Sequence, residues 1–153
     1  MSALHTPLLL LVIGVLSVLA FTFVRRQRDR LAPPGQGLTT GADGVSVVPI
    51  MSAETRGGLL GARIHNSASP KLSLEPQGLA FKVLKEDRWS YDQLTRVDVA
   101  KALLGPMLEF RTDRANLIVN VRDLTVARQV LAALPATAPL TPRARALRDT
   151  GTI

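Results

Sequence analysis

Residues 71–83 read KLSLEPQGLAFKV, two alternating runs on either side of a Pro-Gln-Gly turn. Apolar side chains take every second position in both runs: Leu72, Leu74, Leu79, Phe81 and Val83. A period of two is typical of strands that bury one face, and a short turn with proline and glycine joins such strands antiparallel. The stretch therefore predicts a β-hairpin with one buried face.

A second hairpin follows further along the chain. Residues 85–88 (KEDR) predict a charged turn, and the apolar pattern of residues 89–99 begins as a strand, bends near 91–94 and resumes. Residues 107–110 and 117–121 then flank a Thr-Asp-Arg turn with alternating apolar positions. This pattern predicts a second antiparallel pair of strands.

Beyond residue 122 the apolar period changes from two to that of a helix. The residues at helical spacing are Leu124, Ala127, Val130, Leu131 and Leu134. Asp123 is placed to cap this helix and Pro135 to end it. Strand pairs followed by one amphipathic helix predict an α+β fold, in which the helix closes the open apolar end of a small, bent sheet.

This order of elements resembles the pleckstrin-homology-like (PH-like) domains of bacterial membrane proteins, which are related in shape to GRAM domains. The resemblance is carried by LSLEPQGLAFKV, WSYDQLTRVDV, LEFRT…ANLIVNV and DLTVARQVLAAL. It implies a small antiparallel sheet or barrel with one C-terminal helix across residues 45–135, best supported over 71–135. Residues 45–51 and 59–66 supply one or two further strands, and Pro49 indicates that the first is an edge or irregular strand.

The N-terminal part of the chain is strongly apolar. Residues 8–24 read LLLLVIGVLSVLAFTFV, without a charged side chain. At about 1.5 Å per residue a helix of this length spans roughly 26 Å, close to the ~30 Å hydrocarbon core of a bilayer. A helix also satisfies its own backbone polar groups in lipid. We therefore predict a single transmembrane helix, with residues 1–24 forming a short extracytoplasmic N-terminus and the span.

Four arginines follow the apolar run directly: Arg25, Arg26, Arg28 and Arg30. Basic residues beside a span stay on the cytoplasmic side and are attracted to anionic lipid. We expect these arginines to set the orientation and to contact lipid headgroups. The prediction is a single-pass protein of a bacterial inner (plasma) membrane, with its N-terminus outside and its folded domain in the cytoplasm.

Two other readings of the apolar run stay open. A cleaved signal peptide would release an exported domain, and Val18-Leu19-Ala20 has the small-residue character of a cleavage site. However, the first seven residues lack the basic charge that signal peptides carry there. A buried core helix is the other reading, and it would need a larger protein around it.

The flanks of the predicted domain have linker-like composition. Residues 25–44 combine the arginines with two prolines and four glycines, which predicts a basic juxtamembrane segment and a flexible linker. Residues 136–153 contain Pro139, Pro142 and alternating Arg and Ala, and they predict a disordered tail.

The sequence offers little catalytic chemistry. There is no cysteine, which excludes disulfides and thiolate sites, and the two histidines, His5 and His65, lie outside the best-supported core. Most carboxylates fall at turns or solvent-facing positions beside basic residues, where solvated charge pairs explain them. We predict that the protein is no enzyme and has no catalytic, cofactor or metal site and no small-molecule substrate.

Charge and aromatic content bear on the partners. The net charge is +7, from 19 basic and 12 acidic residues, and much of the excess lies at residues 25–30 and in the tail. Aromatics make up only 4%, so the stacking residues of a nucleic-acid-binding sheet are missing. We predict a scaffold whose partners are the bilayer and an unidentified protein that docks on a sheet face or adds a strand to an edge. The alternative is a domain that senses anionic lipid itself, although residues 75–78 lack a basic cluster.

Overall fold

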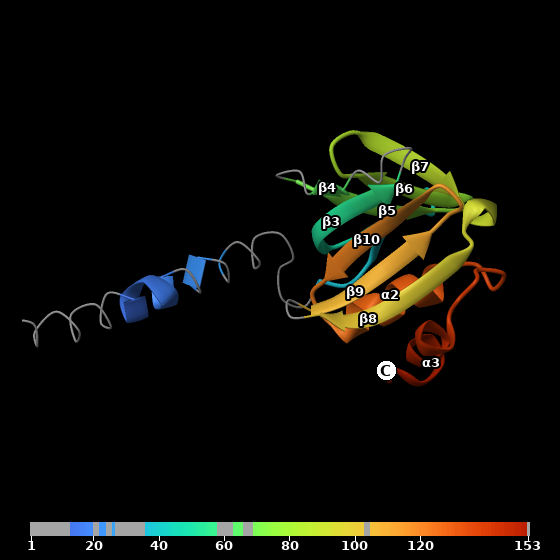
Figure 1. The fold of residues 1–153 in the computed structure, drawn as a ribbon. Coiled ribbons are helices and arrows are strands. Elements are labelled where there is room, and N and C mark those ends of the chain that lie inside the picture. The colour runs from blue at the N-terminus through green and yellow to red at the C-terminus, as the bar shows by residue number, and fades with distance from the viewer. Residues whose placement is uncertain are drawn as a thin grey trace, which may run out of the picture.

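The computed structural model describes residues 13–19, 22–23, 26, 36–57, 63–65, 69–102 and 105–152 (Figure 1). The strands in chain order are β1 (Thr39–Thr40), β2 (Ser46–Val48), β3 (Ile50–Gly57), β4 (Arg63–His65), β5 (Lys71–Glu75), β6 (Gly78–Lys82), β7 (Glu86–Ser90), β8 (Arg96–Ala102), β9 (Gly105–Arg111) and β10 (Ala115–Val121). The helices that accompany them are the 3₁₀ helix η1 (Tyr91–Gln93), α2 (Leu124–Ala133) and α3 (Pro142–Thr150).

The strands form two antiparallel sheets that enclose the core. In the described residues the strand orders are β1-β2-β5-β6-β7 and β4-β3-β10-β9-β8. Side chains from both inner faces are fully buried, among them Leu72 and Leu79 from one sheet and Phe110 and Leu117 from the other. The prediction of an α+β fold with antiparallel strand pairs is confirmed at this level.

Both predicted hairpins form. β5 pairs with β6 so that Leu72 lies opposite Phe81, and β9 pairs with β10 so that Phe110 lies opposite Leu117. The predicted turn at residues 85–88 is wrong in part, because residues 86–88 belong to β7 and pair with β6. β7 is an edge strand whose first side chains are exposed, so it begins with charged residues as a turn would.

Pro49 marks the point where the chain passes from one sheet to the other. β2 precedes it and pairs with β5, whereas β3 follows it and pairs with β10. Of the two predicted alternatives, an edge strand or an irregular strand, the edge strand is wrong, because β2 and β3 each have a neighbour on both sides, whereas the strand is interrupted at Pro49. Proline has no N–H to contribute to a ladder, so it suits the corner between two sheets.

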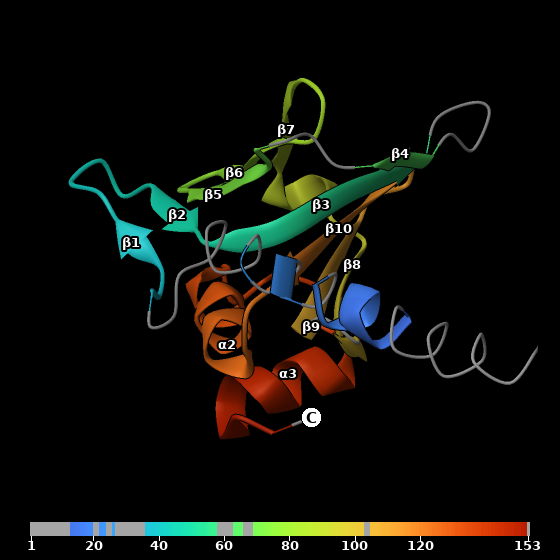
Figure 2. The same cartoon turned by 90° about the vertical axis from the view of Figure 1, so that its left-hand side faces the viewer.

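The helix after β10 is confirmed as predicted. α2 begins after Asp123, whose carboxylate accepts a hydrogen bond from the backbone N–H of Val126 at 2.9 Å. Val130 and Leu131 are fully buried on its inner face. α2 contacts β9 and β10 and covers one end of the space between the sheets (Figure 2).

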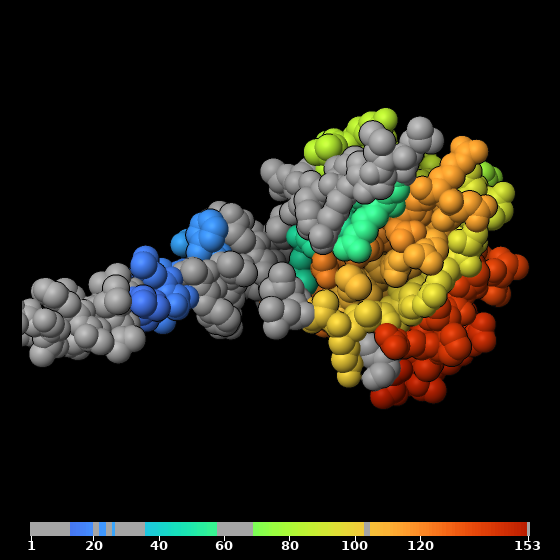
Figure 3. Space-filling view, in the orientation of Figure 1, coloured from blue at the N-terminus to red at the C-terminus, as the bar shows by residue number. Residues whose placement is uncertain are grey.

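The prediction of a disordered tail at residues 136–153, and of a single C-terminal helix, is wrong. Leu140 forms a parallel bridge with Val97, which places residues 139–141 against the edge of β8. α3 follows, with Thr141 as its cap and Gly151 at its left-handed end, and it packs on α2 and β8. Figure 3 shows α3 against β8. The sequence does not indicate this helix, because only one leucine and one alanine are buried on it and they lie among arginines.

Asp98 on β8 holds the C-terminal segment in place. Its carboxylate accepts hydrogen bonds from the Thr141 hydroxyl at 2.7 Å and from the Val99 N–H at 2.8 Å, and it pairs with Arg96. Burial alone would raise the pKa of Asp98, but these hydrogen bonds outweigh burial and lower the pKa below its ordinary 3.8. Asp98 therefore stabilises the fold above pH 4, and this contribution is lost as the pH falls through the lowered pKa.

We expect Asp98→Asn to cost about 1 kcal/mol of unfolding free energy at pH 7, because it removes the charge from three interactions. At pH 3 the difference between the variant and the wild type should shrink, since the wild-type carboxyl begins to protonate. Urea denaturation at both pH values measures this. Glu109→Gln is the control, because Glu109 lies opposite Asp98 on β9 but contacts Arg111 and Asn116. An equal loss for both variants would contradict the role of Asp98.

The domain begins earlier than predicted. Thr39 and Thr40 pair with β2, and the N–H of Leu38 donates to the side-chain oxygen of Gln129 on α2 at 3.0 Å. The end of the predicted linker at 25–44 therefore belongs to the fold. Within the residues that the structure describes, no helix is both long and apolar enough to cross a membrane. Of the predicted span at 8–24, the structure describes residues 13–19 and 22–23, all of them helical, and the other positions lie outside the described residues.

Candidate functional site

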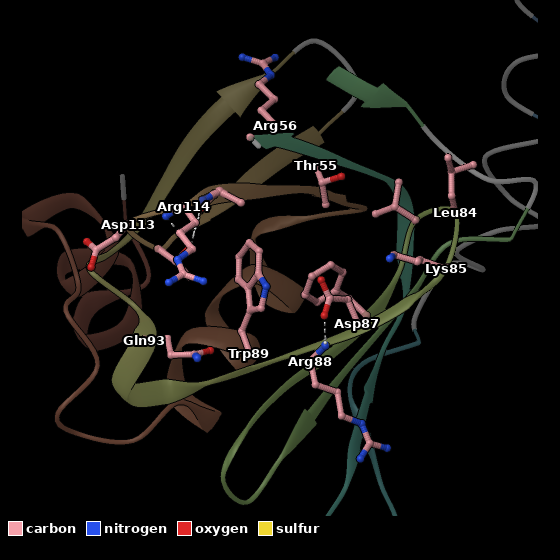
Figure 4. A pocket seen from close by; sticks show the side chains of 15 residues that line it. Thr55, Arg56, Leu84, Lys85, Asp87, Arg88, Trp89, Gln93, Asp113 and Arg114 are labelled. Carbon is pink, nitrogen blue, oxygen red and sulfur yellow. Dashed lines mark hydrogen bonds between the residues drawn. The ribbon is translucent and has the colours of Figure 1, made fainter. Parts of the chain in front are cut away.

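A groove of about 680 Å³ opens at one end of the two sheets, and we call it the mouth groove. It is lined by the end of β3 at residues 55–57, by residues 83–89 at the start of β7, and by the β9–β10 turn at 112–115. These segments lie far apart in the sequence and meet because β3, β9 and β10 all turn at this end. Figure 4 shows them surrounding a central hollow.

The floor of the mouth groove is apolar and fixed. Phe81 on β6 and Trp89 on β7 contact each other edge to face, with ring centres 4.9 Å apart. Val83 continues this floor, and Leu84 stands at the rim with 64% of its surface exposed. An edge-to-face pair holds both rings in one orientation, so the floor is formed before any ligand arrives.

Two cations without a described side-chain partner stand on opposite sides of this floor. Lys85 lies on the β6–β7 turn and Arg114 on the β9–β10 turn, and Figure 4 shows Trp89 between them. Thr112 stiffens the second turn, because its hydroxyl accepts hydrogen bonds from the N–H groups of Arg114 and Ala115 at 3.3 and 3.1 Å. The groove therefore offers positive charge on both sides of an apolar floor.

Three of the other four charged side chains of the groove are already engaged, and the fourth is Asp113. Arg56 forms a salt bridge with Glu54 on its own strand. A guanidinium nitrogen of Arg88 lies 3.5 Å from a carboxylate oxygen of Glu75. The carboxylate of Asp87 accepts a hydrogen bond from the backbone N–H of Arg88 at 2.9 Å. In total, four cations and two carboxylates line the groove, which leaves it with positive charge.

Two sheet edges are less open to strand addition than the sequence suggested. The N–H groups of Arg88 and Ser90 on β7 already donate to the side chains of Asp87 and Gln93. The edge of β8 is covered at Val97, whose N–H and carbonyl bond to residues 139–141. Side chains and chain segments that occupy edge groups block the pairing of a further strand. The mouth groove is thus a better candidate than these two edges.

The groove and the N-terminal approach lie at opposite ends of the domain. β10 runs from Ala115 at the groove to Val121, and α2 begins just beyond that far end. Leu38 reaches the domain at α2, through its hydrogen bond to Gln129. In Figure 2 the two helices lie on one side of the molecule and the tip of β7 on the other. A tether that enters at Leu38 therefore leaves the groove facing away from it.

The corner beside the groove is also held firmly. Tyr91 follows β7, and its hydroxyl donates to the backbone carbonyl of Glu75 at 2.9 Å. Burial raises the pKa of Tyr91, and the charge of Glu75 raises it further, so the phenol keeps the proton that it donates. This hydrogen bond therefore fixes the chain where it leaves β7.

The residues predicted as a lipid-contact site lie elsewhere. Of Arg25, Arg26, Arg28 and Arg30, only Arg26 is among the described residues, where it is helical and exposed. The lipid contact of all four stays a prediction. Sequence reasoning did not find the mouth groove, because Lys85 and Arg114 lie in separate turns and each has an acidic residue beside it in the sequence.

Metal ligation and relatives give no further guidance. In the part of the chain that the structure describes, no three His, Cys, Asp or Glu side chains are grouped so that they could hold a metal ion. No protein-family model, curated protein or solved structure matches this chain.

Proposed function

We propose that this chain is a single-pass membrane protein that displays a PH-like, non-enzymatic binding domain to the cytoplasm and recruits a protein partner at the mouth groove. The observation that carries the proposal is the groove itself, with an apolar floor and unpaired cations at the end opposite the tether. Such an arrangement suits binding, because an apolar anchor supplies affinity and a few charges supply orientation.

The membrane part of the proposal rests on the N-terminal residues. In the described helical stretch at 13–19, the large apolar side chains are exposed, with Ile13 at 51% and Leu16 at 60%. Exposed apolar side chains on a helix are unfavourable in water. The hydrocarbon core of a bilayer is the environment that the uncharged run 8–24 fits. The arginines from 25 to 30 then favour a cytoplasmic domain.

The PH-like part of the proposal is supported by the order of the elements. A hairpin pair, a bend at η1, the strands β8 to β10 and a closing helix follow one another as the resemblance implies. The domain departs from it in β1 and α3, which the resemblance does not include. The non-enzymatic part rests on the sequence, in which cysteine is absent and most carboxylates fall beside basic residues.

Position-specific photo-crosslinking in cells tests the recruitment. A photoreactive residue in place of Leu84 should give a discrete protein adduct in the membrane fraction. The same residue in place of Val47, which is also apolar and 54% exposed but lies on β2, should not. Adducts to lipid alone, or equal adducts at both positions, would contradict recruitment through the groove.

A further inference from the structure

We infer that the mouth groove takes an extended peptide with an apolar anchor residue and acidic residues on both sides of it. This inference rests on the proposed function and names the chemistry of its partner. It follows from where the charges stand relative to the floor. Lys85 and Arg114 lie on opposite rims, and Trp89 lies between them (Figure 4).

The placement of charge favours a peptide over a lipid. A lipid carries its charge at one end and its apolar part at the other, so it matches a site with cations on one side. The mouth groove has Lys85 and Arg114 on opposite sides of its apolar floor, and its four cations outnumber its two carboxylates, Asp87 and Asp113. A chain segment with an acidic, apolar, acidic order matches this pattern at all three points.

A second hollow beside the groove extends the basic surface. It has a volume of about 490 Å³ and lies over the outer face of β9 and β10, where Arg111 and Asn116 line it. Arg56 and Arg114 line both hollows, so they form the ridge between them. An acidic peptide that leaves the groove past Arg114 therefore stays in contact with positive charge.

The site is also prepared for binding. The floor is held by the contact between Phe81 and Trp89, and the turn that carries Arg114 is held by Thr112. A ligand therefore loses little free energy in ordering the protein. The volume of about 680 Å³ lies in the range of ordinary ligand sites and accommodates a large side chain with its flanking backbone.

Selection from a displayed library of random twelve-residue peptides tests the inference. The target is the full-length chain in nanodiscs of neutral lipid. We expect the selected peptides to carry Asp or Glu on both sides of a Leu, Phe or Trp. The double variant Lys85→Glu/Arg114→Glu should weaken the best peptide by about tenfold or more, since repulsion replaces two attractions, and added salt should reduce the difference.

Matched variants separate the possible outcomes. Lys101→Glu is the charge control, because Lys101 is exposed at the far end of β8, and it should leave binding unchanged. Leu84→Asp should abolish binding, whereas Val47→Asp should not.

Three results would overturn the inference. The first is selection of neutral or basic peptides whose binding is abolished by Leu84→Asp but unchanged by the double charge reversal. This result would refute the acidic ligand and leave the groove as a protein-binding site. Selection of no peptide, or of peptides indifferent to Leu84→Asp, would refute the proposed function as well. If the domain bound nanodiscs of anionic lipid and no peptide, Lys85 and Arg114 would be assigned to contact with a membrane surface.

Discussion

Ending the chain after Pro135 should abolish cooperative folding of the domain. This change removes Leu140, Ala144 and Leu147, which are buried, and it uncovers the edge of β8. Loss of one buried leucine costs about 2–5 kcal/mol, and whole domains have only about 5–15 kcal/mol of stability. The expected result is a chain that gives no sharp unfolding transition by circular dichroism.

A matched pair of substitutions keeps this prediction specific. Ala144 is fully buried in α3 and Ala146 is exposed on the same helix. Ala144→Asp should destabilise the domain by about 3 kcal/mol or more, because it buries an unpaired charge, and Ala146→Asp should change it by about 0.5 kcal/mol or less. Equal stability for the two variants would show that α3 is dispensable.

Deleting residues 1–24 should move the protein from the membrane fraction to the soluble fraction almost completely. A transmembrane helix holds a protein in the bilayer effectively irreversibly, whereas the arginines that remain supply only surface attraction. Extraction at alkaline pH followed by immunoblotting measures the change. The described domain begins at residue 36, so the deletion should leave its unfolding transition intact.

The arginines give the control for this experiment. Replacing Arg25, Arg26, Arg28 and Arg30 by Gln should leave the protein resistant to extraction but weaken its preference for one orientation. A truncated protein that stays in the membrane fraction would contradict the anchor. A mature wild-type N-terminus near Phe21 would instead support cleavage of a signal peptide.

The hairpins were predictable because their signal is local. Leu72 and Phe81 face each other across a turn only a few residues long, so alternation and turn chemistry decide the pairing together. α2 was predictable for the same reason, since Asp123 and Pro135 mark its ends within one short stretch. Both patterns can therefore be recognised from the local sequence alone.

The elements that were missed depend on distant contacts. Pro49 indicates a break in pairing, but its role as the corner between two sheets depends on β5 and β10, which come later in the chain. α3 has too few apolar residues to be recognised until β8 and α2 provide the surface on which Leu147 packs. In each case, tertiary packing decides what local composition leaves open.

The mouth groove was missed for a related reason. Its two unpaired cations, Lys85 and Arg114, lie in different hairpins, and only the packing of the two sheets brings them to the same end. The sequence indicates only that Trp89 belongs to a strand, and its contact with Phe81 in the structure places it on the floor of the mouth groove. A site built from turns of separate hairpins leaves no spacing signal in the sequence.

Labelling of single cysteines tests the central claim most directly, that a tethered domain presents its groove to the cytoplasm. The natural chain has no cysteine, so Leu84→Cys and Ser2→Cys each introduce a unique thiol. With a maleimide that does not cross membranes, Ser2→Cys should react in intact spheroplasts, and Leu84→Cys should react only after the inner membrane is opened. Reaction of Leu84→Cys in intact spheroplasts would contradict the account.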